Sequence, residues 1–123
     1  MKHTLFTLTV VATMMLAASR TAFAHHSHAM FDMTREVTVT GTVTNFSFRN
    51  PHVFLYLDVK GPDGQVTNWA IEMSYVGNME SRGIYLSTFK PGDTVTVSVN
   101  PLRDGRHGGN YTSVTAADGK KYD

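Results

Sequence analysis

The segment that most constrains the fold is EVTVTGTVTNFSF (Glu36–Phe48), in which apolar and hydroxyl-bearing residues alternate. Its valines fall on one face of an extended chain and its threonines on the other, a pattern that predicts a half-buried β-strand. Phe46 and Phe48 fall on the threonine parity, so we expect a bulge or a sharp bend near Gly41 or Asn45. A long first strand that bends midway is typical of a small closed barrel.

Alternation in three later segments predicts further strands, and Pro and Gly mark the turns between them. These segments are His52–Val59, Gln65–Met73 and Thr94–Leu102. The turn GPDG (Gly61–Gly64) joins the first two of them into a hairpin. RDGRHGGN (Arg103–Asn110) predicts a flexible loop, and Tyr111–Tyr122 predicts a fifth strand with a tail.

The segment Ser74–Gly83 breaks the alternation and predicts a helix of about two turns. The serine that opens it suits an N-cap and the glycine that ends it suits a C-cap, with Tyr75, Val76 and Met79 expected to face inward. Three strands, a short helix and two strands follow the order of the OB-fold, a five-stranded Greek-key barrel. We therefore predict an all-β, OB-fold-like barrel over residues 36–123, with a small open β-sandwich as the alternative.

The N-terminus has the features of an export signal. A short basic start precedes Leu5–Ala18, a mostly apolar run of 14 residues. That run is shorter than the roughly 20 apolar residues that span a bilayer, which disfavours a retained membrane anchor. Ala22 and Ala24 form a small-x-small cleavage pattern, so residues 1–24 are predicted to be a signal peptide removed after Ala24. We expect a periplasmic or secreted protein with no membrane insertion after cleavage.

The composition of the predicted mature chain excludes several classes of function. Removing the leader leaves 99 residues, enough for one small domain, with 9 basic against 10 acidic side chains. A nearly neutral exported protein is a poor candidate for binding nucleic acid. The chain contains no cysteine, which excludes disulfides and thiolate metal sites. It has no serine in the context of a nucleophile elbow, and we do not predict an enzyme.

The stretch AFAHHSHAMFDM (residues 22–33) crosses the predicted cleavage site into a predicted N-terminal arm, residues 25–35, and contains three histidines and two methionines. Cleavage after Ala24 makes His25 the first residue, with a free amine beside its imidazole. Amine and imidazole nitrogens together suit Cu(II), and imidazole also suits zinc and nickel. The candidate ligands are His25, His26, His28 and His52. Weaker candidates are the thioethers of Met30 and Met33, which favour Cu(I).

His52 lies at the predicted start of the second strand, on the face that it shares with Phe54 and Tyr56. Glu72, on the neighbouring third strand, is a weaker candidate, either as a ligand or as a partner that orients an imidazole. An arm laid along that face would bring an N-terminal histidine to His52. The sequence therefore predicts a metal site where the arm meets the start of the second strand.

Each of these residues also has a plainer interpretation. The histidine-rich arm is then a solvated tail, and His52 hydrogen-bonds only a backbone carbonyl. His107 is expected to be a solvated loop residue, and Asp32 to form a turn or a cap. Packing in the core is the expected role of Trp69, Met73 and Met79. A metal site is favoured by the conjunction of clustered histidines, a predicted N-terminal histidine and methionines within one short segment.

Three motifs carry a family resemblance: the double histidine with serine (25–27), the Asn-Pro-His triplet (50–52) and FKPGD (89–93). Together they resemble a family of small exported bacterial proteins that is catalogued as domain of unknown function 6152. The chain departs from the usual pattern at His28, where an aromatic residue is common, and at Phe48, where tryptophan is common. The resemblance implies export and a β-barrel-like domain, and it implies no established activity.

The favoured function is an exported, periplasmic metal-binding protein, with copper as the preferred ion, acting in binding, delivery or tolerance. The alternative is an OB-fold module that binds a ligand or a periplasmic protein partner, without a metal, on the strand face of Phe54 and Tyr56. A copper oxidoreductase is the least favoured function, because the chain offers no other catalytic set. Loss of binding below about pH 6 would distinguish the first function from the second, because imidazoles protonate there.

Overall fold

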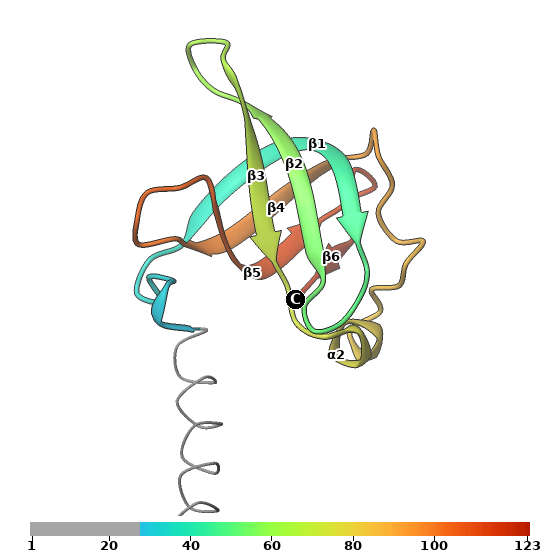
Figure 1. Cartoon of the computed structure of the whole chain (residues 1–123). Coiled ribbons are helices and arrows are strands. Elements are labelled where there is room, and N and C mark those ends of the chain that lie inside the picture. The colour runs from blue at the N-terminus through green and yellow to red at the C-terminus, as the bar shows by residue number, and fades with distance from the viewer. Residues whose placement is uncertain (1–27) are drawn as a thin grey trace, which may run out of the picture. The chain divides into compact units, whose positions relative to one another are not determined.

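The computed structural model describes residues 28–123, and the predicted leader and its cleavage site lie outside them. Residues Phe31–Asp123 form one compact unit, separate from the residues up to Met30. The elements follow one another (Figure 1) in the order β1 (Val37–Ser47), β2 (Phe54–Lys60), β3 (Val66–Glu72), α2 (Val76–Ser81), β4 (Thr94–Pro101), β5 (Gly108–Thr115) and β6 (Lys121–Tyr122). None of the helices in this part of the chain is long and apolar enough to cross a membrane.

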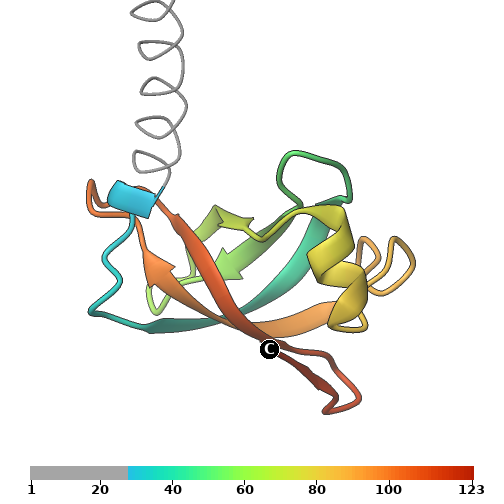
Figure 2. The same ribbon diagram turned by 90° about the horizontal axis from the view of Figure 1, so that it is seen from below.

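The strands form one sheet that closes on itself as a barrel. Their order is β3-β2-β1-β4-β5-β6, and each neighbouring pair in that order is antiparallel. The start of β5 also pairs in parallel with the end of β3, through Ala70↔Gly108 and Glu72↔Asn110. This pairing closes five strands into a barrel, so the OB-fold prediction is confirmed and the open sandwich is wrong. β6 adds a small hairpin to the end of β5 (Figure 2).

Two buried glycines at the start of β5 allow this closure. A Cβ atom on Gly108 would lie 2.5 Å from the Ala70 carbonyl oxygen, and one on Gly109 would lie 2.8 Å from a methyl carbon of Val99. The predicted loop over residues 103–110 is therefore wrong at its end, where residues 108–110 belong to β5. Glycine here serves the close approach of neighbouring backbones rather than the flexibility of a loop.

β1 bends where the phase of its alternation changes. Its pairing with β2 shifts between Val43 and Asn45, which leaves Thr44 as the extra residue of a β-bulge. Gly41 serves a different purpose, because a Cβ atom there would lie 2.6 Å from the Asp58 carbonyl oxygen. The bulge predicted near Asn45 is confirmed, and Gly41 lets the β2 backbone approach β1.

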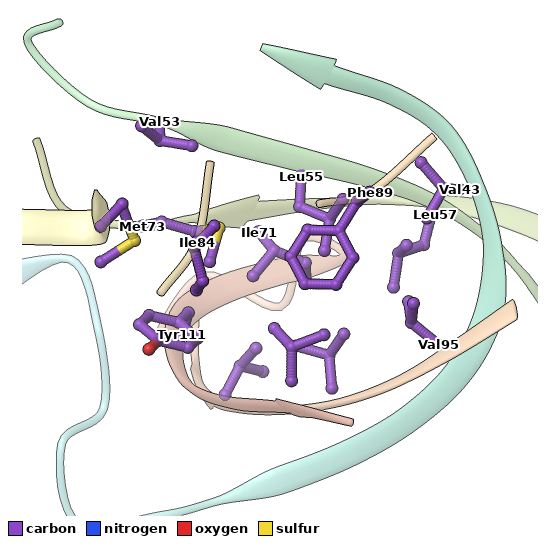
Figure 3. Packing of buried hydrophobic residues seen from close by; sticks show 14 residues of the cluster. Val43, Val53, Leu55, Leu57, Ile71, Met73, Ile84, Phe89, Val95 and Tyr111 are labelled. Carbon is purple, nitrogen blue, oxygen red and sulfur yellow. The ribbon is translucent and has the colours of Figure 1, made fainter. Parts of the chain in front are cut away.

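The hydrophobic core fills the inside of the barrel (Figure 3). Alternate residues of β2 and β4, each at most 2% exposed, supply much of it: Leu55, Leu57, Val95, Val97 and Val99. Met73 and Met79 are buried, as predicted, and Trp69 packs half-buried against the cluster. The alternation read from the sequence thus identifies the inward face of both strands correctly.

The N-cap of the helix lies one residue later than predicted, and the capping side chain comes from a distant part of the chain. Tyr75 is the N-cap residue of α2 and makes no side-chain cap hydrogen bond; the N–H of Val76 donates instead to Oδ1 of Asn50, at 2.9 Å. Ser74 is therefore not the N-cap. Gly83 follows the helix with a φ of 80°, a left-handed conformation that suits the predicted C-terminal glycine. Tyr75, expected to face inward, is 58% exposed.

Candidate functional site

His52 and Glu72 meet on the outside of the barrel, where β2 begins and β3 ends. Glu72 is the last residue of β3 and pairs with Phe54, two residues after His52. The Nδ1 atom of His52 lies 2.5 Å from Oε1 of Glu72, and its N–H donates to the carboxylate. The His52 side chain is 42% exposed and that of Glu72 is 17% exposed. The contact orients the imidazole ring and leaves Nε2 as the nitrogen available to a ligand.

The segment that carries His52 is held on both sides. Before it, Oδ1 of Asn50 caps α2, and the Asn50–Pro51 peptide bond is cis. After it, the N–H of Val53 donates to the carbonyl oxygen of Ser74 at 3.0 Å. The Asn-Pro-His triplet therefore ties the start of β2 to the segment between β3 and α2. The His52 side chain projects from a backbone that is fixed on either side of it.

Phe54 and Tyr56 project from β2 on the same side as His52, because alternate residues of a strand share a face. Their ring centroids are 5.9 Å apart and their ring planes differ by only 19°. Both rings are half-buried, whereas the residues between and after them point into the core. On β3, Glu72 lies opposite Phe54 and Ala70 lies opposite Tyr56. We call this surface the aromatic face and define it by Phe54, Tyr56, Asp58, Asn68, Ala70 and Glu72.

The far end of the aromatic face carries a second carboxylate. Oδ1 of Asp58 accepts a hydrogen bond of 3.0 Å from the side-chain amide of Asn68, its partner on β3. The same amide donates to the Thr44 hydroxyl at 3.4 Å. The two aromatic rings therefore lie between a carboxylate held by an imidazole and a carboxylate held by an amide.

The predicted arm divides between the two units of the chain. His28 and Met30 are exposed and precede the barrel unit, while His25 and His26 lie outside the described residues. Met33 is 51% exposed, so its thioether is accessible. Within residues 28–123, no three His, Asp or Glu side chains converge on one point. Of the predicted ligands, the structure brings together His52 and Glu72, and ligation by the arm stays a prediction.

Two other acidic residues are held in turns of their own. Oδ1 of Asp32 accepts hydrogen bonds from the Thr34 hydroxyl (2.6 Å) and the Thr34 N–H (3.1 Å), which confirms the turn expected there. These bonds lower the pKa of Asp32 below its usual 3.8. The backbone N–H and guanidinium of Arg106 likewise lower the pKa of Asp104 in the loop after β4. Both carboxylates stabilise turns rather than the candidate site.

Two side-chain contacts in the described part of the chain have no signal in the sequence. The His107 ring lies 5.5 Å from the Trp69 ring at an angle of 43°, so this exposed loop residue covers an aromatic ring of β3. Asn50 caps a helix whose first residue lies 26 positions further along the chain. The residues next to His107 and Asn50 in the sequence give no indication of the residues that they contact. Both contacts depend on the way the barrel brings distant loops together.

Comparisons with known proteins bear on the fold and the family. No curated protein matches the chain. Among solved structures, the chain is similar to the mitochondrial single-stranded DNA binding protein Rim1 from S. cerevisiae, with a TM-score of 0.52 and 10% identity, covering 68% of this chain and 93% of that chain. At this identity the likeness shows the OB-fold alone. The model of a family of unknown function, DUF6152, matches residues 12–112, and the chain belongs to this family.

Proposed function

We propose that the processed protein is an exported metal-binding protein, with copper as the preferred ion, and that His52 and the N-terminal histidines hold the metal. The contact between His52 Nδ1 and the Glu72 carboxylate supports this function. A carboxylate that accepts the N–H of an imidazole fixes the ring and makes its other nitrogen a better ligand, an arrangement common around metals in proteins. At 42% exposure, the His52 side chain is open to a ligand from outside the barrel.

The remaining ligands in this proposal come from the arm. If the leader is removed after Ala24, His25 supplies an amine and an imidazole, and His26 and His28 supply further imidazoles. Such a nitrogen set suits Cu(II) above zinc and nickel. Met30 and Met33, 43% and 51% exposed, offer thioethers that suit Cu(I). A donor set that accommodates both oxidation states fits binding, delivery or tolerance of copper.

Titration of Cu(II) into protein that begins at His25 tests this function. We expect one ion to bind per chain, and we expect His52→Ala to weaken binding by about tenfold or more, because it removes a nitrogen that binds the metal directly. His107→Ala is the matched control, since His107 is an exposed histidine that packs on Trp69. If His52→Ala binds copper as tightly as the unmodified protein does, the proposed site is wrong.

The aromatic face supports a second function, the recognition of a ligand without a metal. Two nearly parallel rings stand half-exposed on β2, beside β3, and the face of these two strands is where OB-folds commonly bind ligands. This function predicts that binding fails in Phe54→Ala or Tyr56→Ala and survives in His25→Ala. The metal function predicts the reverse order of sensitivity.

A further inference from the structure

The aromatic face has a distinct charge pattern. Glu72 lies opposite Phe54 at one end and Asp58 follows Tyr56 at the other, so carboxylates lie at both ends of the rings. The paired residues of β1 on this side, Thr42, Asn45 and Ser47, are uncharged. The positions that define the face carry two aromatic rings and two carboxylates, and the first basic residue on this side of β2 is Lys60, which follows Asp58 beyond them. Such a surface repels polyanions and attracts cations.

The chemistry of the rings points the same way. Lys and Arg side chains bind over the faces of Phe and Tyr rings, and a nearby carboxylate adds to that attraction. Asp58 is held in place by the Asn68 amide, which is neutral and so leaves the carboxylate charge uncompensated. A positively charged group above Tyr56 would therefore meet a ring and a fixed carboxylate together.

The spacing of these groups matches an extended chain. Phe54, Tyr56 and Asp58 are alternate residues of β2, so their side chains recur every ~6.6 Å. The alternate residues of an extended peptide recur at the same interval. Basic side chains at every second residue of such a peptide would therefore lie opposite successive side chains of the aromatic face.

We propose that the aromatic face binds an extended segment of a partner protein in which Lys or Arg recurs at every second residue. This inference rests on the second proposed function, that the face binds a ligand. It needs neither the N-terminal histidines nor a metal ion, so it is tested with a chelator present. A neutral glycan or a single-stranded nucleic acid on the same face is the competing outcome.

The experiment measures the affinity of the full-length protein for a fluorescent peptide in which Arg alternates with Ser, with a Gln-Ser peptide as the uncharged control. We expect the Arg peptide to bind and the Gln peptide to bind at least about tenfold more weakly. Phe54→Ala and Tyr56→Ala should each weaken Arg-peptide binding by about threefold to thirtyfold. Tyr85→Ala is the matched control, because Tyr85 is an exposed tyrosine, at 53%, outside the aromatic face.

A second, conservative variant is needed because Phe54→Ala and Tyr56→Ala each remove a half-buried ring and can destabilise the fold. Asp58→Asn keeps the shape of an exposed side chain, and it should weaken Arg-peptide binding and reduce its dependence on salt. Asp104→Asn, a loop carboxylate engaged with Arg106, should change neither property. Equal affinity for the Arg and Gln peptides would overturn the inference.

Two further probes separate this inference from the function on which it depends. If a neutral oligosaccharide or a single-stranded oligonucleotide binds in a manner that Tyr56→Ala abolishes, while the Arg peptide does not bind, the face is a binding surface and the basic-peptide inference is wrong. If none of the probes binds, both the inference and the second proposed function fail.

Discussion

Asn50 and Val76 are joined by a hydrogen bond of 2.9 Å, from the Val76 N–H to Oδ1 of Asn50. The bond links the turn before β2 to the first residue of α2. Two residues after Asn50, His52 contacts Glu72 at the end of β3. One triplet therefore has two separable roles, because its asparagine stabilises the helix and its histidine forms the candidate site.

Loss of the cap should destabilise the fold. Asn50→Ala leaves the Val76 N–H without its partner, and removal of a side-chain N-cap of this kind costs about 1 kcal/mol. We expect Asn50→Ala to lower the free energy of unfolding by that amount, measured by urea denaturation.

Ser74→Ala is the control for this prediction, since Ser74 is the cap suggested by the sequence pattern. The structure assigns its hydroxyl no cap hydrogen bond, so the substitution should change stability by less than about 0.5 kcal/mol. A larger loss in Ser74→Ala than in Asn50→Ala would contradict the structure at this helix.

Closure of the barrel should tolerate no side chain at Gly108. A Cβ atom there would lie 2.5 Å from the carbonyl oxygen of Ala70, so Gly108→Ala must separate β5 from β3. We expect a loss of about 1–3 kcal/mol in the free energy of unfolding. Gly77→Ala, in α2, meets only the flexible Tyr75 ring at 3.4 Å and should be neutral or stabilising. Equal losses in the two variants would show that β5 does not close on β3.

The Tyr111 hydroxyl should make no favourable contribution to stability at neutral pH. Tyr111 is 9% exposed, and its buried hydroxyl oxygen makes no hydrogen bond of good geometry among the described residues, although the Arg82 guanidinium lies nearby. Tyr111→Phe removes that unsatisfied group. We expect an effect between no change and a gain of about 1 kcal/mol, measured by denaturant titration. A loss above about 1 kcal/mol would show that the hydroxyl has a partner in solution.

The same residue predicts a dependence on alkaline pH. Burial raises the pKa of Tyr111 above its usual 10.0, although the nearby Arg82 guanidinium opposes the shift. Above pH 10.0 the unfolded chain therefore loses the phenol proton first, and stability falls until the pH reaches the folded pKa. We expect Tyr111→Phe to lose less stability than the unmodified protein between about pH 8 and about pH 11. Parallel losses in the two proteins would exclude this contribution.

Glu72 should affect metal affinity through His52. Glu72→Ala frees the imidazole that the carboxylate now orients, and loss of such a partner lowers metal affinity by about 10- to 100-fold. Glu72→Gln retains an oxygen acceptor for Nδ1–H and should lose less. Glu80→Ala, an exposed carboxylate on α2, is the control and should bind copper normally. Titration with a competing chelator measures each affinity.

The sequence predicts the barrel well, because alternation depends on burial and burial decides which face of a strand is apolar. The bulge in β1 and the inward residues of β2 and β4 follow from this signal. The alternation signal fails where a glycine is required by the close packing of strands that are distant in the sequence. Gly108 and Gly109 have the composition of a loop, yet they belong to a strand because they permit close contact with Ala70 and Val99.

The candidate site is predicted only in part. The placement of Glu72 on the strand next to His52 predicts that the two side chains lie close together, and their contact confirms that proximity. The cap on α2 is misassigned to Ser74, because a helix can take its cap from a distant loop and no local pattern signals Asn50. His107 is similarly expected to be solvated, and its contact with Trp69 depends on where the loop after β4 crosses the barrel.

Native mass spectrometry of the protein from a periplasmic fraction is the decisive test of copper binding by the processed chain, because one spectrum reports both the mature N-terminus and any bound metal. We predict a mass that begins at His25 with one copper ion retained, and loss of that ion in His52→Ala. A protein that begins at His25 and stays free of metal after copper is supplied would contradict the proposed metal-binding function.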